Sequence, residues 1–147
     1  MRYCTLEDLT LAIPARTLAQ LSNDTSPATE PNLPVIERAV AHAEEVIDGY
    51  LRSRYELPLK DVPTVVRELT VNIARHWLYA RRPEGKDDLP PAVVRAYKAA
   101  MDMLAAIQKG ALTIGVQASL GSQPEPGKMR VKTSGSRLFG RSTLDKY

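Results

Sequence analysis

Apolar residues recur at steps of three and four along most of the first 110 residues, the spacing that places them on one face of an α-helix. The pattern predicts three long amphipathic helices: residues 34–54, Pro63 to Pro83, and Asp88 to Gly110. The expected apolar stripes are Ile36, Val40, Ala43, Ile47, Tyr50 and Leu51, then Val66, Leu69, Ile73, Trp77 and Ala80, then Val94, Tyr97, Met101, Leu104 and Ile107. Three such stripes can share one core, which predicts an all-α bundle.

Two short helices are expected before the long ones. Thr5, followed by acidic residues, is typical of a helix N-cap, and the helix should end at Ile13 because Pro14 disfavours α conformation in the residue before it. Pro14 can itself open a second short helix that runs to Leu21. The apolar side of the first short helix is expected to be Leu6, Leu9 and Leu11.

The connections between the helices differ in composition. Residues 22–34 hold Ser, Asn, Asp, Thr and prolines, which is typical of a loop, whereas residues 56–59 (ELPL) are apolar enough to pack under the bundle. Gly110 stands where a left-handed helix C-cap is expected. Residues 111–116 alternate small or polar residues with Leu, Ile and Val, which predicts a short strand or extended segment.

Composition limits the classes of protein that this chain can belong to. Its 147 residues suffice for one domain, and 44% hydrophobic with 25% charged residues is typical of a soluble globular chain. A single cysteine, Cys4, excludes an intramolecular disulfide framework and a cysteine-based zinc site. No apolar run approaches a membrane span, and the N-terminus does not begin a signal peptide, so we expect a reducing, cytoplasmic setting without membrane contact.

The formal net charge of +3 is unevenly distributed along the chain. Residues 117–147 carry +4, whereas residues 1–116 carry −1. The basic segment holds half of the chain's glycines together with several serines and two prolines. Such a segment cannot bury enough apolar area to offset the entropy lost when it becomes ordered, so it should not form a core of its own. Its Phe and several aliphatic residues alternate with Arg and Lys. We therefore divide the chain into a helical domain, residues 1–116, and a basic C-terminal arm, residues 117–147, that becomes ordered on a partner.

No catalytic, cofactor-binding or metal-binding constellation is apparent. His42 and His76 lie on separate expected helices without the spacing of a zinc motif, and no glycine loop for phosphate precedes a helix. Glu44 and Asp48 fall on the expected solvent face of their helix, where Asp48 and Arg52 are spaced to pair. We therefore expect the chain not to be an enzyme and to need no cofactor.

Nucleic-acid binding remains an alternative. Arg75, Arg81 and Arg82 lie near the end of an expected helix with Tyr79 between them, although basic residues at a helix C-terminus also have a structural reason in the helix dipole. The connections are too long or proline-bound for a helix-turn-helix. The main rival interpretation is therefore a small helical DNA-binding protein that uses the basic tail.

Several segments together resemble one family. They are residues 47–59 (IDGYLRSRYELPL), 72–79 (NIARHWLY), 97–110 (YKAAMDMLAAIQKG) with the following LTIG, and the closing 137–147 (RLFGRSTLDKY). In this order, after a short helix near residues 3–5 and with Val62-Pro63 between, they resemble the head-to-tail connector, or adaptor, proteins of tailed bacteriophages. The match is to the Mu-like branch and covers nearly the whole chain.

The resemblance implies a neck protein of the virion, assembled in the host cytoplasm. Such a protein forms a homo-oligomeric ring of about twelve subunits beneath the portal protein. The arm would contact the portal, a stopper or tail-completion protein would dock below, and DNA would pass through the bore. Acidic and basic residues on the first long helix would then make contacts between subunits. The expected subunit-interface residues are Arg38, Glu44, Asp48 and Arg52, and the expected arm anchors are Arg130, Lys132, Arg137, Leu138, Phe139 and Arg141.

Overall fold

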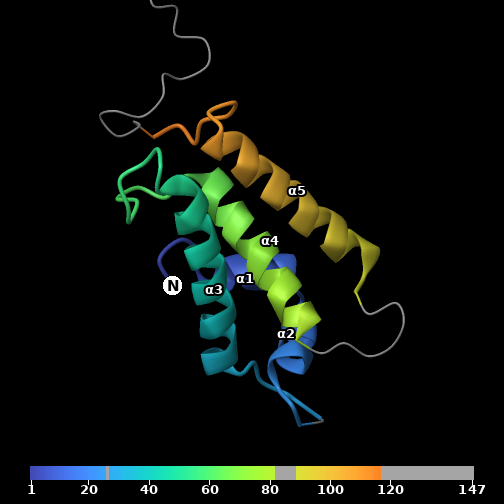
Figure 1. Ribbon diagram of the computed structural model, residues 1–147. Helices are drawn as coiled ribbons and strands as arrows, with labels where there is room; N and C mark the ends of the chain where they lie inside the picture. Colours follow the sequence, from blue (N-terminus) through green and yellow to red (C-terminus); the bar gives the residue numbers. More distant parts are fainter. Residues whose placement is uncertain (26, 82–88, 117–147) are drawn as a thin grey trace, which may run out of the picture.

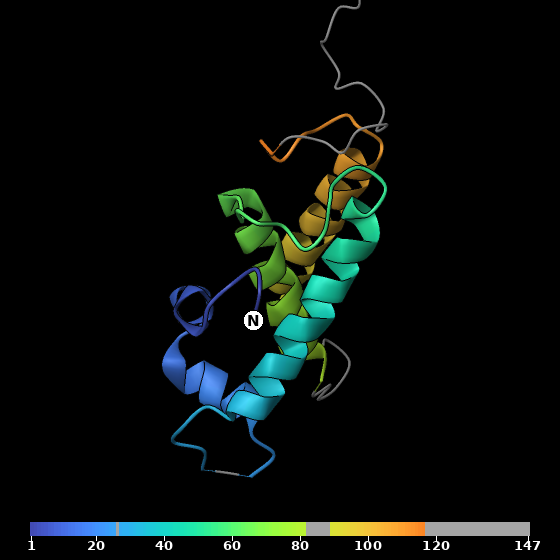
Figure 2. The same cartoon turned by 90° about the vertical axis from the view of Figure 1, so that its left-hand side faces the viewer.

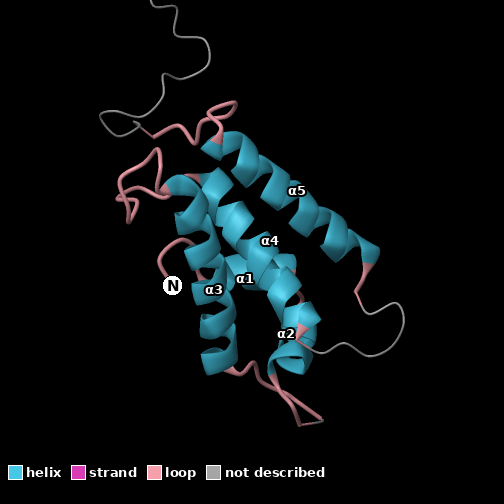
Figure 3. Ribbon diagram, in the orientation of Figure 1, coloured by secondary structure: helices cyan, strands magenta, loops and turns pink. Residues whose placement is uncertain are grey.

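The computed structural model describes residues 1–25, 27–81 and 89–116, and within them the chain forms two short and three long helices joined by loops, with no strand (Figures 1 and 3). The helices are α1 (Leu6–Ala12), α2 (Ala15–Ser22), α3 (Leu33–Leu51), α4 (Thr64–Ala80) and α5 (Pro91–Gln108). This confirms the predicted all-α bundle. The arm lies outside the described residues, and so do its six expected anchors.

Helix α4 is the central element of the bundle. It contacts each of the other helices, and the three long helices also contact one another. Figure 2 shows α1 and α2 together on one side of the long helices, with α5 on the other side of α4. A helix surrounded in this way needs apolar residues on more than one face, and α4 accordingly buries Val66, Leu69, Ile73, Ala74 and Leu78.

The stripes read from the sequence supply most of the core. Ile36, Val40 and Ile47 of α3 are fully buried, and Leu104 and Ile107 of α5 belong to the same buried cluster. Each such side chain contributes roughly 1.5–3 kcal/mol relative to leaving it in water. The N-terminal residues Tyr3, Cys4, Leu9, Ile13 and Leu18 complete the core.

Three positions in the expected stripes are wrong. Val94 is 42% exposed and the adjacent Val93 is buried in its place; both lie about one turn before Tyr97, so the spacing alone did not separate them. Leu11 is 88% exposed, since two residues after the buried Leu9 a helix has turned by about 200°. Ala80, at the end of α4, is also exposed.

The helix ends follow the expected chemistry closely. Thr5 caps α1 in a capping box: its Oγ1 accepts from the Asp8 N–H at 3.3 Å, and its own N–H donates to Asp8 Oδ2 at 2.8 Å. The Thr5 backbone N–H is the main cause that lowers the pKa of Asp8. Helix α3 begins at Leu33 and ends at Leu51, three residues short of the predicted end.

Gly110 has the predicted left-handed conformation, with φ +80°. The Ala111 N–H donates to the Ala106 carbonyl at 2.9 Å, which closes the end of α5. Beyond it, residues 111–116 form no strand, the first of the two predicted alternatives: they follow an irregular path with bends, and Gly115 also has a positive φ, +79°. Ile114 nevertheless packs into the core at 5% exposure.

The link between α3 and α4 packs as predicted. Leu59 is buried and Leu57, which precedes Pro58 through a cis peptide bond, lies half-buried against the core. Among the described residues, none of the helices combines the length and apolar character that crossing a membrane requires.

Candidate protein interaction surfaces

Arg2 and Tyr3, which precede α1, are bound to Glu44 and Asp48 on the side of α3. We call these four residues the N-terminal clamp. Glu44 Oε1 accepts hydrogen bonds from the backbone N–H groups of Arg2 and of Tyr3, the latter at 2.9 Å, and Arg2 Nε donates to Glu44 Oε2 at 3.1 Å. One turn along α3, Asp48 accepts from the Tyr3 hydroxyl at 2.5 Å and pairs with Arg2 Nη2 at 3.0 Å.

The electrostatics of the clamp favour the ionised form of Glu44. Burial alone would raise the pKa of Glu44, but hydrogen bonds from the Tyr3 and Arg2 backbone N–H groups and the Arg2 side chain outweigh it, so the pKa is lowered. Burial and the hydrogen bond to Asp48 raise the pKa of Tyr3 to about 12. The clamp therefore holds the ionised Glu44 carboxylate beside the Arg2 guanidinium against the wall of the bundle.

The clamp corrects the expectation of a solvent-exposed acidic face. Glu44 is 4% exposed and Asp48 is half-buried, because the N-terminal segment covers this side of α3. Asp48 pairs with Arg2 rather than with Arg52. The helical period correctly placed Glu44 outside the apolar stripe. It cannot predict that Arg2 and Tyr3, about forty residues earlier in the chain, pack over this side of α3.

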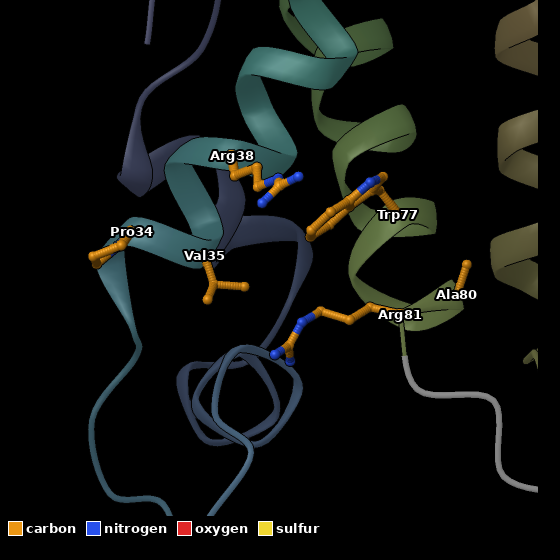
Figure 4. Close-up of a pocket in the computed structure, with 6 residues that line it drawn as sticks. All are labelled: Pro34, Val35, Arg38, Trp77, Ala80 and Arg81. Carbon is orange, nitrogen blue, oxygen red and sulfur yellow. The ribbon is translucent and has the colours of Figure 1, made fainter.

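A second surface is a groove of about 540 Å³ between the start of α3 and the end of α4 (Figure 4). We call it the α3–α4 groove. In Figure 4, Val35 and Arg38 extend from α3 toward α4, and Trp77 and Arg81 extend from α4 toward α3. The groove is lined by Pro34, Val35, Arg38, Trp77, Ala80 and Arg81. Its lining is thus mainly apolar, with two arginines.

The two arginines of the α3–α4 groove differ in how they are held. Arg81 Nη2 donates to both carboxylate oxygens of Asp24, at 2.5 and 2.7 Å, and Arg81 Nη1 donates to the Leu21 carbonyl at 3.0 Å. Arg38 is exposed and forms no salt bridge within the part of the chain that the structure describes. A positive charge without a partner therefore lies beside an open apolar surface, as is common for a protein-binding surface.

A third arginine is buried where α3 and α5 end. Arg54 is 3% exposed, and its guanidinium packs against Gly110 so closely that a Cβ there would lie 2.1 Å from Nη1. Its Nε and Nη2 have no hydrogen-bond partner among the described residues. The negative end of the α5 dipole gives this charge a favourable position. Arg54 is therefore a structural residue of the helix ends.

His76 and Cys4, two residues that the sequence analysis considered for chemistry, are both packed against other parts of the bundle. The His76 ring stacks on Tyr97 with centroids 3.9 Å apart, and burial lowers its pKa. Cys4 is a buried free thiol, and burial raises its pKa to about 11. Within residues 1–25, 27–81 and 89–116, no three His, Cys, Asp or Glu side chains are placed to share a metal ion.

Of the four expected interface residues, the structure leaves Arg38 and Arg52 exposed and uses Glu44 and Asp48 in the clamp. Their role between subunits stays a prediction. The sequence interpretation did not single out Arg2 or the groove wall formed by Trp77. The available signal for the groove was the chain's one Trp, near the end of an expected helix, with an arginine four residues later.

Comparisons with known proteins agree with the Mu-like resemblance. Residues 3–133 match the family described as Bacteriophage Mu, Gp36. Gene product J of Escherichia phage Mu is 26% identical over 141 residues, which cover 96% of each chain. The Mu-like prophage FluMu protein gp36 of Haemophilus influenzae is 28% identical over 110 residues, covering 74% of this chain and 72% of that protein. The matched span includes the whole helical bundle, and the chain belongs to the Bacteriophage Mu Gp36 family.

Proposed function

We propose that the chain is a structural neck protein of a Mu-like virion, forming an oligomeric ring that joins the portal of the DNA-filled head to the tail or stopper proteins. The observation that carries the proposal is the family match across residues 3–133, because it places the chain among Mu phage proteins. The order of segments that resembles the head-to-tail connectors supplies the more specific role.

The shape and surface of the bundle suit assembly. A ring subunit must be rigid, and α4 packed against four other helices provides a rigid body. It must also expose surface that another protein can cover, and the α3–α4 groove offers apolar area beside Arg38, which has no salt bridge within the described residues. The proposed protein acts by docking, without catalysis and without a cofactor.

The basic arm would fasten the ring to its neighbour. A segment that becomes ordered on a partner covers a large surface at a cost in entropy, and repetition around a ring multiplies such weak contacts by avidity. Arg137 and Phe139 are of the residue types that dominate binding energy at interfaces. We assign portal contact to the arm and subunit contact to the bundle.

Electron microscopy of the full-length chain mixed with purified portal particles tests the proposal directly. The expected result is a ring of additional density on one end of the portal, of about twelve copies, coaxial with its channel. Portal particles that remain bare at saturating concentrations of the chain would contradict the proposed role.

Truncation after Val116 tests the division of labour between bundle and arm. The five helices lie within residues 1–116, so the melting temperature should change little, while binding to the portal is lost. The full-length chain with Lys128 and Lys146 changed to Ala is the matched control, since it keeps the expected anchors and removes part of the charge. A truncated chain that unfolds would show that the arm belongs to the core.

The DNA-binding alternative is supported by the net charge of +4 on residues 117–147. It predicts tight binding of the free chain to duplex DNA, with an affinity that falls steeply as salt rises, because each neutralised phosphate releases counterions. A fluorescence anisotropy titration at two salt concentrations separates the interpretations. Binding to the portal that persists when DNA binding is negligible favours the neck protein.

A further inference from the structure

One large apolar side chain of the bundle is almost wholly in water. Leu11, in the last turn of α1, is 88% exposed, more than any of the other large hydrophobic side chains of the described residues. Glu7 lies one turn earlier on the same side of α1, and Glu68 of α4 lines the same shallow hollow as Leu11. We call Glu7, Leu11 and Glu68 the Leu11 face.

The charges on the Leu11 face are mainly negative. Glu7 and Glu68 are exposed and form no salt bridge within the described ranges. Asp8 and Arg67 also line the hollow. Asp8 Oδ2 and Arg67 Nε lie 3.9 Å apart, so the charges of these two side chains offset each other. The face is thus an apolar projection flanked by two free carboxylates.

The α3–α4 groove has the complementary character. It is a hollow of about 540 Å³ with Val35, Trp77 and Ala80 in its lining, which is ample space for a leucine side chain. Arg38 supplies positive charge at the same place, whereas the charge of Arg81 is offset by Asp24. An apolar projection with carboxylates on one surface therefore matches an apolar hollow beside the Arg38 guanidinium on another.

The two surfaces lie on opposite sides of α4. Glu68 and Trp77 are nine residues apart on this helix, and at about 100° per residue this is two and a half turns, so the two side chains point in opposite directions. Nine residues also separate them by about 14 Å along the axis. A chain cannot dock its own Leu11 face into its own groove, but a second copy can.

We propose that neighbouring subunits associate head to tail, with the Leu11 face of one copy docked in the α3–α4 groove of the next. Two different surfaces on opposite sides of a subunit make a heterologous contact, and such a contact closes into a ring when the rotation between copies allows it. The inference rests on the proposed ring function and names the contact that builds it. Leu11 is the apolar anchor, and Arg38 faces the carboxylates of the adjacent copy.

Two substitutions in the full-length chain test the contact: one blocks the Leu11 face, and the other blocks the α3–α4 groove. Leu11→Lys places a cation against Arg38 of the next copy, and it suits the C-terminal end of α1, so folding is preserved. Ala80→Trp fills the groove from an exposed position. The matched controls are Leu112→Lys and Ala99→Trp, which make the same changes at exposed positions away from both surfaces.

Sedimentation velocity of the free chain, and electron microscopy of the chain on portal particles, measure assembly. We expect each blocked variant to self-associate at least about tenfold more weakly than the wild type, while both controls assemble normally and all four variants keep the wild-type melting temperature. Removing a single leucine contact accounts for a change of this size, and the repulsion or steric block adds to it.

Mixing the two blocked variants gives the sharpest result. The Ala80→Trp chain keeps an intact Leu11 face and the Leu11→Lys chain keeps an intact groove. A heterologous contact therefore predicts dimers with one copy of each variant and no larger species. A symmetric contact, in which the same patch meets itself, gives no such rescue.

The remaining outcomes separate the inference from the proposed function. If both blocked variants form normal rings on the portal, or if their mixture yields no dimers although the wild type assembles, the inference is wrong and the neck function stands. If the wild type self-associates through Leu11 but ignores the portal, the inference stands and the neck function is wrong. A wild type that remains monomeric alone and on the portal contradicts both.

Discussion

Arg38 and Glu44 lie six residues apart on α3, and their surroundings are opposite. Glu44 is 4% exposed and accepts hydrogen bonds from two backbone N–H groups and one guanidinium, all from the N-terminal clamp. Arg38 stands exposed beside the α3–α4 groove and has no salt bridge among the described residues. Both belong to the polar side of the same amphipathic helix, yet one charge is used inside the subunit and the other is available outside it.

The difference shows how function can be separated from stability on one helix. A charge that is buried and bonded within the subunit stabilises the fold, because its removal leaves donors without an acceptor. A charge beside an open apolar hollow contributes little to the fold and a great deal to docking. Substitutions along α3 should therefore affect either unfolding or assembly, depending on which region they change.

The largest effect on stability is expected at Glu44. Glu44→Ala leaves the backbone N–H groups of Arg2 and Tyr3 without their acceptor and removes the partner of the Arg2 guanidinium. We expect the free energy of unfolding to fall by about 3 kcal/mol, because bonds to a charged acceptor are among the stronger ones in proteins. Urea unfolding followed by circular dichroism measures it.

Glu45 provides the matched control for this prediction. It is the next residue on α3 and is exposed, so Glu45→Ala should change the free energy of unfolding by less than about 0.5 kcal/mol. Equal losses for Glu44→Ala and Glu45→Ala would show that the clamp adds no stability.

A somewhat smaller loss in the free energy of unfolding is expected at Gly110. This position tests the buried Arg54, a second charge that is used inside the subunit. Gly110→Ala must adopt φ +80° and place its Cβ 2.1 Å from Arg54 Nη1. We expect a loss of about 2 kcal/mol from the backbone strain and from the displaced guanidinium. The Gly49→Ala variant is the control, since nothing lies within 4 Å of a Cβ there and the position is inside α3. If the two variants melt at the same temperature, the close packing at Gly110 has no energetic weight.

The sequence predicted the helices better than it predicted the surroundings of single polar residues such as Glu44. The helical period and the proline positions predicted every helix to within a few residues, because burying an apolar stripe is decided by spacing within each helix. The same reasoning failed where a distant segment intervenes. Glu44 was placed in solvent because the period records which side of α3 is polar and not that Arg2 and Tyr3 return to cover it.

The binding surfaces were harder to predict than the fold. Trp77 was read correctly as part of the apolar side of α4, but a half-buried wall of a groove and a core residue have the same spacing. Leu11 was expected in the core, and its exposure follows from its position two residues after the buried Leu9, about 200° away around α1. The choice between core and surface at such positions depends on where the next element packs.

A still smaller effect is expected from acidification. The pKa of Glu44 is lower in the folded chain than its usual value of 4.5, so the unfolded chain binds more protons there in acid. The stabilising contribution of Glu44 is present above the unfolded pKa and is lost as the pH falls through the folded pKa. The difference in unfolding free energy between wild type and Glu44→Gln should therefore shrink between about pH 7 and about pH 3. A constant difference over this range would show that the charge of Glu44 is not what the clamp recognises.

The smallest change in stability, and the clearest separation of the two regions, is expected at Arg38. Arg38→Ala removes a side chain that has no salt bridge in the described part of the chain, so the free energy of unfolding should change by less than about 0.5 kcal/mol. Self-association should nevertheless weaken, because the carboxylates of the Leu11 face lose the cation opposite them. Arg95→Ala, an exposed arginine of α5 outside the groove, is the matched control and should leave both quantities unchanged. An Arg38→Ala chain that is destabilised as much as Glu44→Ala would show that the groove belongs to the structural interior, and the distinction between the two regions of α3 would no longer hold.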